Sequence, residues 1–231
     1  DMMKTICVAG LFMLVLVAET DLGGAVIFFM VFVMMLYLAT GKHSILIGGG
    51  LGGSVLAVVG YMLLKNHFSH VTMRIDAWLN PIEYIDGSGY QVAQSLFAIG
   101  SGGLFGKGLG ESLQKLGNVP ESQNDMIFTI ICEELGLFGA ICLILLFILL
   151  IWRMMVIANN ARDLYGSLLV IGVMSHIAIQ VILNIAVVTN SLPNTGVILP
   201  FISYGGTSII FLMAEIGLVL SVSRGIRLEN V

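Results

Sequence analysis

The sequence predicts an all-α membrane protein: a polytopic bundle of about six transmembrane helices, with a large extracellular loop that carries short helices. Composition is the first observation behind this prediction. Of the 231 residues, 58% are hydrophobic and only 10% are charged, whereas soluble domains carry about 25% charged residues. The second observation is that apolar stretches of bilayer-spanning length, about 20 residues, recur along the chain. The net charge of −4 excludes a bulk attraction to nucleic acid.

The apolar stretches are predicted to form one integral membrane domain over residues 1–231. The six predicted spans are 4–19, 22–40, 45–64, 126–151, 166–189 and 205–223. Because an even number of crossings returns the chain to the side on which it began, both termini are expected on one side of the membrane.

Lysine and arginine are distributed unequally between the short loops of the two sets. The long loop holds Lys65, Arg74, Lys107 and Lys115, but long loops count little in the positive-inside rule. The set that contains the termini, 41–44 and 152–165 holds Lys4, Lys42, Arg153, Arg162, Arg224 and Arg227. The short loops of the opposite set, 20–21 and 190–204, hold no basic residue. The positive-inside rule therefore predicts a multi-pass protein with cytoplasmic termini and an extracellular loop at 65–125.

The long loop is rich in glycine between residues 87 and 110. Residues 90–99 are expected to form a short amphipathic helix, with Gln91, Gln94 and Ser95 toward one side. A phosphate-loop motif ending at Lys107 is excluded because residues 101 and 108 do not fit its pattern. The glycines fit a flexible surface turn, or a loop on the membrane face with Lys107 and backbone N–H groups near an anionic headgroup.

Asp125 lies directly before the fourth predicted span. With Ser122 it forms a pattern similar to a capping box, which predicts an acid at the start of a helix, favoured by the helix dipole. An aspartate at the outer boundary of the membrane is also placed to take a proton from a substrate hydroxyl. The two roles are compatible, and both stay open.

Glu133 and Glu134 lie deeper in the same predicted span. At 100° per residue, Glu133 is about 80° and Glu134 about 180° from Asp125 around the helix. An ionisable residue inside a membrane span is costly and suggests a function. Glu133 is therefore a candidate site residue, whereas Glu134 is expected to meet a neighbouring helix.

Polar residues also occur in the last two predicted spans. His176, Gln180 and Asn184 recur at helical spacing and form one polar stripe, which we interpret mainly as interhelical hydrogen-bonding groups. Glu215 requires a partner that the sequence does not name.

Residues 192–208 interrupt an apolar region with two prolines and three glycines and carry no charge. Such backbone is expected to be shaped and non-helical. Non-helical backbone at membrane depth is tolerated only where it is buried in protein or lines a cavity. We expect this segment to form a wall of an outward-facing cavity, with Asn194, Ser203 and Tyr204 as candidate substrate contacts.

These motifs together resemble the SEDS family (shape, elongation, division and sporulation), which comprises the bacterial cell-wall polymerases FtsW, RodA and SpoVE. The matching pieces are Glu19-Thr20-Asp21-Leu22-Gly23, Gly89-Tyr90-Gln91, Gln94-Ser95-Leu96, Gly100 to Gly108, Pro120-Glu121, Asp125-Met126-Ile127-Phe128, Glu133-Glu134-Leu135-Gly136 and Leu199-Pro200-Phe201-Ile202-Ser203-Tyr204-Gly205-Gly206. Residues 110–115 are more similar to the FtsW/SpoVE branch. The chain departs from the family in having Asn124 before the aspartate, and it resembles only the C-terminal six-span portion. A fragment, one part of a split protein, or a longer protein whose N-terminal half is not included in this sequence all fit.

The resemblance implies a peptidoglycan glycosyltransferase that polymerises lipid II with inversion at the outer face of the bacterial cytoplasmic membrane, in cell division or sporulation. Asp125 would be the general base on the acceptor hydroxyl. The substrate-binding residues would be Gln91, Gln94, Ser95, Lys107, Lys115, Glu121, Glu133, Asn194, Ser203 and Tyr204. The negative charge of the leaving undecaprenyl pyrophosphate would be balanced by Lys107, Lys115, a divalent cation (Mg²⁺ or Mn²⁺), or residues of the N-terminal half that family members have before this portion. No organic cofactor is expected.

The resemblance also implies partners: a class B penicillin-binding protein and other membrane proteins of division or sporulation. Two rival functions stay open. A lipid II flippase would also use intramembrane carboxylates and a discontinuous segment. A non-catalytic scaffold would instead dock the transmembrane helix of a penicillin-binding protein.

Overall fold

The structure, a computed structural model, describes residues 2–19, 21–64, 69–114 and 122–226. These residues form helices and connecting turns without a strand, which confirms the predicted all-α class. The helices are α1 (Met2–Ala18), α2 (Leu22–Thr40), α3 (His43–Leu64), α4 (Ser69–Leu79), α5 (Tyr90–Gly102), α6 (Ile127–Asn159), α7 (Leu164–Val188) and α8 (Gly206–Arg224).

Four of these helices are long and apolar enough to cross a membrane: α2, α6, α7 and α8. Their bounds lie close to the predicted spans, with one correction. The fourth span continues past residue 151 to Asn159, so the predicted loop at 152–165 is much shorter. Met154, Ile157 and Ala158 are buried, and this apolar face holds the extension in place despite the charge on Arg153.

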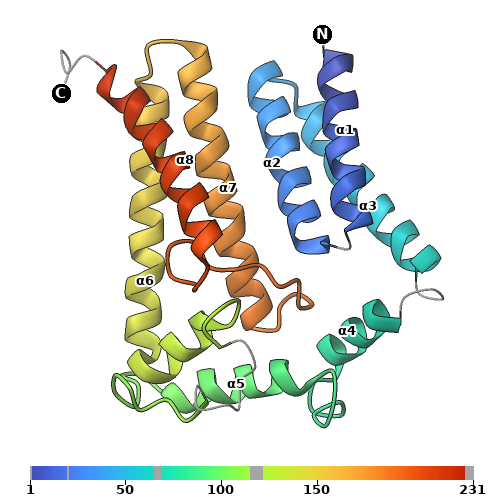
Figure 1. Cartoon of the computed structure of the whole chain (residues 1–231), viewed down its shortest axis with the longest axis vertical. Coiled ribbons are helices and arrows are strands. Elements are labelled where there is room, and N and C mark those ends of the chain that lie inside the picture. Colours follow the sequence, from blue (N-terminus) through green and yellow to red (C-terminus); the bar gives the residue numbers. More distant parts are fainter. Residues whose placement is uncertain (1, 20, 65–68, 115–121, 227–231) are drawn as a thin grey trace. The chain divides into compact units, whose positions relative to one another are not determined.

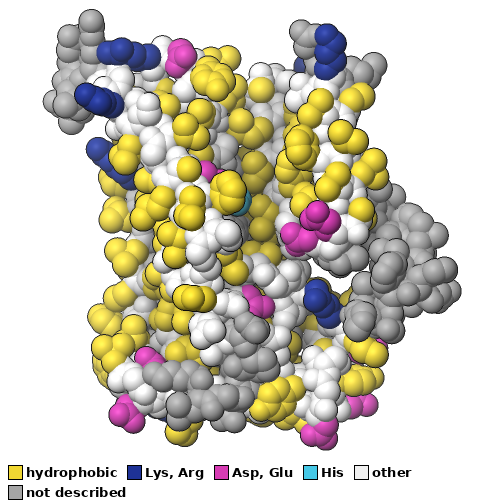
Figure 2. All heavy atoms as spheres, viewed as in Figure 1, with side chains coloured by type: hydrophobic (Ala, Val, Ile, Leu, Met, Phe, Trp, Pro, Cys, Tyr) yellow, Lys and Arg dark blue, Asp and Glu magenta, His cyan; other side chains and the backbone are white. Residues whose placement is uncertain are grey.

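The chain divides into two compact units, and each is described by itself. The first unit comprises residues 1–52, 151–179 and 211–231. In it, α1 and α2 run antiparallel and side by side (Figure 1). Phe28 lies between Phe12 and Phe32, with ring centroids 6.2 Å and 6.4 Å away. Hydrophobic side chains cover the visible surface of these helices (Figure 2), as expected for a face turned to lipid.

The turn between α1 and α2 is held by a helix cap. The Asp21 carboxylate accepts a hydrogen bond of 2.8 Å from the backbone N–H of Gly24. This is the usual N-cap arrangement, and it satisfies one of the backbone donors that a helix start leaves unpaired.

The second unit comprises residues 53–150 and 180–210 and contains all the described candidate site residues. It holds α4, α5, the first part of α6, the end of α7 and the irregular segment that precedes α8. Its core includes Ala98, Met126, Thr129, Val188 and Leu199, each at most 1% exposed.

The long loop carries short helices, as predicted. The expected helix at 90–99 is α5, and it extends to Gly102. Its buried residues, Val92, Ala93, Ser95, Ala98 and Gly102, recur at helical spacing and define the face that packs on the core. Gln91 and Gln94 are partly exposed, whereas Ser95 points into the core.

Candidate active site

Asp125 lies in a turn over residues 122–126, two residues before α6 begins at Ile127. Asp125 is partly exposed, and the next side chain, Met126, is 1% exposed. The buried methionine anchors the turn in the core, so that the aspartate is presented at its edge.

Three consecutive backbone carbonyls of this turn accept hydrogen bonds from elsewhere in the second unit. The N–H of Tyr204 donates to Gln123 at 2.9 Å. The hydroxyl of Ser203 donates to Asn124 at 2.6 Å, and the side-chain amide of Asn184 donates to Asp125 at 2.7 Å. None of these three bonds involves the Asp125 carboxylate, so they fix the backbone of the turn that carries it.

Asn184 joins three parts of the second unit. Its side-chain nitrogen also donates to the carbonyl of Val197 at 2.7 Å, and the residue is completely buried. Asn184, in the polar stripe of α7, therefore forms hydrogen bonds to other elements, as predicted. Its acceptors, however, are backbone carbonyls of non-helical segments and not side chains of a neighbouring helix. Gln180, one turn earlier, is buried, and its side-chain oxygen has no partner among the described residues.

The segment between α7 and α8 is non-helical, as its prolines and glycines predict. Two residues other than glycine have positive φ, Asn190 at 56° and Phe201 at 64°. Ser203 is buried, and its hydroxyl accepts from the N–H of Leu199 at 2.8 Å while donating to the turn of Asp125. The single hydroxyl proton of Ser203, a predicted substrate contact, is thus donated to the backbone carbonyl of Asn124.

Asn194 and Gln91, both predicted site residues, meet. The side-chain amide of Asn194 donates to Gln91 at 3.0 Å, and its oxygen accepts from the N–H of Gly196 at 3.0 Å. Asn194 therefore orders the irregular segment against the start of α5.

Arg74 on α4 is a cation near this site that the sequence analysis missed. Its guanidinium donates to the carbonyl of Asn194 at 3.4 Å. One turn later, Trp78 and Asn190 exchange two hydrogen bonds of 3.1 Å each. The only signal in the sequence was an arginine in an amphipathic stretch, and such residues are usually solvated.

Other predicted residues divide between surface and core. Tyr204 is 76% exposed, and Gln94 is partly exposed. Ser95 is buried, with its hydroxyl 2.8 Å from that of Thr129 and 3.0 Å from the carbonyl of Val188. Ser95 therefore joins α5, α6 and α7. Lys115 and Glu121 lie outside the described residues.

The carboxylate of Glu133 is completely buried and surrounded by donors from the glycine-rich loop. One oxygen accepts from the Lys107 ammonium at 2.6 Å and lies 3.5 Å from the Ser101 hydroxyl. The other accepts from the Ser112 hydroxyl at 2.5 Å and from the N–H of Gln114 at 3.3 Å.

The glycine-rich loop also pairs with a break in α6. The helix is interrupted at Gly136, where φ is 68° and ψ is −166°. The N–H groups of Leu137 and Phe138 then donate to Gly103 and Leu104 at 2.9 and 3.1 Å. In return, the N–H groups of Lys107 and Gly108 donate to Glu133 and Glu134, each at 3.0 Å. The break thus exchanges helical hydrogen bonds for bonds to the loop.

Close approach of two backbones explains the glycines at this junction. A Cβ added at Gly136 would overlap the backbone nitrogen of Gly106, and one added at Gly106 would overlap the carbonyl of Glu134. The loop is therefore packed against α6. The backbone N–H groups of Lys107 and Gly108, and the ammonium of Lys107, are engaged within the protein, which differs from the expected use on an anionic headgroup.

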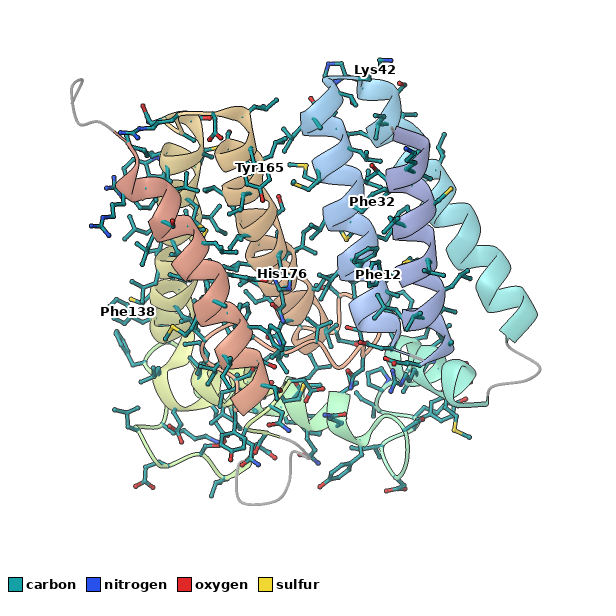
Figure 3. The ribbon with its side chains drawn as sticks, turned by 45° about the horizontal axis from the view of Figure 1, so that its top comes forward. Phe12, Phe32, Lys42, Phe138, Tyr165 and His176 are labelled. Atoms are coloured by element: carbon teal, nitrogen blue, oxygen red, sulfur yellow. The ribbon has the colours of Figure 1, made fainter. Side chains whose placement is uncertain are left out.

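An apolar groove of about 460 Å³ lies beside the break, and Phe138 on its wall points away from α6 (Figure 3). The groove is lined by Phe105, Ile131, Leu135, Phe138, Gly139, Cys142, Leu143 and Leu146. No group of three or more His, Cys, Asp and Glu side chains that could hold a metal ion occurs among the residues that the structure describes.

Glu215 has a partner in the first unit. The imidazole of His176 lies 3.0 and 3.1 Å from the two carboxylate oxygens of Glu215, and it projects from α7 toward α8 (Figure 3). This pair belongs to a different unit from the turn of Asp125.

Comparisons with known proteins cover nearly the whole chain. The FtsW/RodA/SpoVE family model, described as a cell cycle protein, matches residues 1–228. The chain is 42% identical over 213 residues to stage V sporulation protein E of Bacillus subtilis strain 168, covering 91% of this chain and 57% of that protein. It is 40% identical over 213 residues to a probable peptidoglycan glycosyltransferase FtsW of Trichlorobacter lovleyi, covering 92% of this chain and 55% of that protein.

Two solved structures are similar to this chain in fold. One, described as structural coordination of polymerization and crosslinking by a peptidoglycan synthase complex, matches with a TM-score of 0.72 and 25% identity, over 96% of this chain and 62% of that one. A crystal structure of a mutant Thermus thermophilus rod-shape-determining protein RodA has the same fold, with a TM-score of 0.60, 24% identity, and coverage of 97% and 58%. The chain spans a little over half the length of the curated relatives it matches.

Proposed function

Because the chain belongs to the FtsW/RodA/SpoVE family, in its FtsW/SpoVE branch, we propose that the complete protein is a peptidoglycan glycosyltransferase of the bacterial cytoplasmic membrane. The named relatives include probable peptidoglycan glycosyltransferases, and the matched complex combines polymerization with crosslinking. The apolar helices support a multi-pass protein.

In the proposed reaction, Asp125 takes the proton from the C4 hydroxyl of the acceptor N-acetylglucosamine of lipid II. The hydroxyl oxygen forms a bond to the anomeric carbon of the donor N-acetylmuramic acid, and the bond from that carbon to undecaprenyl pyrophosphate breaks. An α-linked donor then gives a β-linked product in a single displacement. One base is sufficient, and no covalent sugar intermediate forms.

The observation that carries this assignment is the turn of Asp125, fixed through three consecutive carbonyls by Tyr204, Ser203 and Asn184. A general base must be held at a set position, because reaction rates depend steeply on the geometry of the reacting groups. Here the backbone is fixed from both α7 and the irregular segment, and the carboxylate is at the edge of the buried core.

Positive charge is needed beside the leaving pyrophosphate. Since Lys107 is bonded to Glu133, Lys115 and Arg74 are the better candidates within this chain. A divalent cation could supply the same charge, but the described residues offer no cluster to hold it, and no step above depends on one.

Cytoplasmic termini and an extracellular loop at 65–125 would place Asp125 at the outer face, where the lipid II sugar is presented. The charge distribution of the short loops supports this orientation. A class B penicillin-binding protein is the proposed partner, because the matched structure is a synthase complex that joins polymerization to crosslinking.

The test is product analysis with purified complete protein in liposomes to which lipid II is supplied externally. New glycan strands are expected. Movement of the lipid II headgroup across the membrane without polymer would contradict a polymerase and support the flippase. Neither polymer nor movement, from protein that still binds its penicillin-binding partner, would support the scaffold.

A further inference from the structure

We propose that Glu133 and Lys107 form a buried latch that positions the Asp125 turn, and that neither residue contacts substrate. The catalytic part of this inference rests on the proposed function, whereas the latch itself can be tested without it. The resemblance placed both residues among the substrate contacts, so the inference reassigns them.

Most of the acceptor capacity of the Glu133 carboxylate is already used. A carboxylate offers about four lone-pair positions. One oxygen of Glu133 accepts from Lys107, and the other accepts from Ser112 and Gln114. The Ser101 hydroxyl lies 3.5 Å away, but its proton has a nearer acceptor in the carbonyl of Ala98 at 2.9 Å. The side chain is 0% exposed. Because the side chain is enclosed, a substrate hydroxyl has no path to this carboxylate.

Lys107 has a structural role as the counter-ion of the buried Glu133 carboxylate. A buried carboxylate without a counter-ion is costly, and removing one partner of a buried pair is strongly destabilising. The Lys107 ammonium, whose side chain is 31% exposed, meets this carboxylate at 2.6 Å. The lysine neutralises Glu133 from the loop side, so its positive charge is committed within the protein.

The latch lies at one end of a short helical segment, and Asp125 lies at the other. Because α6 breaks at Gly136, the helix between Asp125 and the break is not continuous with the long apolar part that follows. At its start this segment is held by Asn184, Ser203 and Tyr204. At its end it is held by the loop, through the backbone pairs at the break and the Glu133 network.

The orientation of the segment, and hence of Asp125, therefore depends on both attachments. Without the latch, the loop and the segment end would lose the one ion pair described between them, and the segment end would be held mainly by the backbone pairs at the break. A displacement of about 1 Å at a reacting group can cost about 10²-fold in rate.

The test compares Lys107→Met, Glu133→Gln and the double variant in the complete protein. Lys107→Met leaves a buried charge uncompensated, so we expect a Tm lower by several degrees and a kcat reduced by about 10²-fold, with KM nearly unchanged. The double variant removes the charge as well. The amide oxygen can still accept from Ser112 and Gln114, so most of the lost Tm and kcat should return.

Lys42→Met and Glu83→Gln are the matched controls, because both residues are exposed and outside the network; neither should change Tm or activity. If Lys107 bound the pyrophosphate, the double variant would be no better than Lys107→Met and KM would rise, which overturns the proposal. A double variant that does not fold also overturns it. If the double variant recovers its Tm but neither it nor the unaltered protein polymerises lipid II, the proposed function is refuted and the latch is kept.

Discussion

The side-chain amide of Asn184 donates a hydrogen bond of 2.7 Å to the backbone carbonyl of Asp125. The same nitrogen donates to Val197 at 2.7 Å, so a single buried residue of α7 holds both the candidate base and the segment that faces it. The base is thus oriented through its backbone by a residue that does not take part in proton transfer.

Replacing Asn184 should therefore weaken the site and the fold together. We expect Asn184→Leu to leave two carbonyls without their donor and to lower the free energy of unfolding by about 1–3 kcal/mol. Polymerisation should fall because the turn of Asp125 loses an attachment. Thermal unfolding and a lipid II polymerisation assay measure the two effects.

Gln180→Leu is the matched control for that change, since Gln180 lies one turn earlier on α7 and is also buried. Its side-chain oxygen has no partner within the described ranges, so removing the amide should leave stability equal or slightly higher. Equal losses in the two variants would show that Asn184 has no special role.

Gly136→Ala should disrupt the break in α6. The backbone there has φ of 68° and ψ of −166°, a region populated almost only by glycine, and an added Cβ would overlap the backbone of Gly106. A loss of at least about 1–3 kcal/mol in the free energy of unfolding is expected from strain alone, measured by thermal or chemical unfolding.

Gly100→Ala serves as the comparison for the glycine substitution. Gly100 is inside α5 and exposed, and an added Cβ there meets nothing within 4 Å. Because alanine favours helix over glycine by about 1 kcal/mol, this variant should be neutral or stabilised. A Gly136→Ala protein as stable as Gly100→Ala would mean that the helix is not broken at this position.

His176 and Glu215 should be energetically coupled. Their side chains lie 3.0 Å apart between α7 and α8, and residues in contact typically show coupling of about 0.5–3 kcal/mol. We expect the sum of the losses in free energy of unfolding from His176→Leu and Glu215→Leu to exceed the loss in the double variant. A double-mutant cycle on thermal unfolding measures this, and simple additivity would argue against the contact.

Much of the fold could be predicted from the sequence because its determinants are local. Apolar length predicted the four membrane-length helices α2, α6, α7 and α8, and the spacing of small and polar residues predicted α5. Asn184 was recognised as polar in a membrane helix, but its acceptors are carbonyls of Asp125 and Val197, which no local pattern shows.

The break in α6 illustrates what the sequence could not show. A single glycine in a helical pattern is usually tolerated, and the fourth span was predicted as continuous. The break at Gly136 is stabilised by backbone bonds to residues 103–108, which are distant in sequence. The pairing of Lys107 with Glu133 depends on the same long-range contact, and it therefore escaped prediction too.

The most direct test of the account is polymerisation of lipid II by the complete protein carrying Asp125→Asn, with Asp86→Asn, an exposed aspartate of the same loop, as control. The exchange keeps the shape of the side chain and removes the base, so the account predicts no glycan polymer, an unchanged Tm, and normal activity in the control. Near-normal polymerisation by Asp125→Asn would contradict the assignment of Asp125 as the general base.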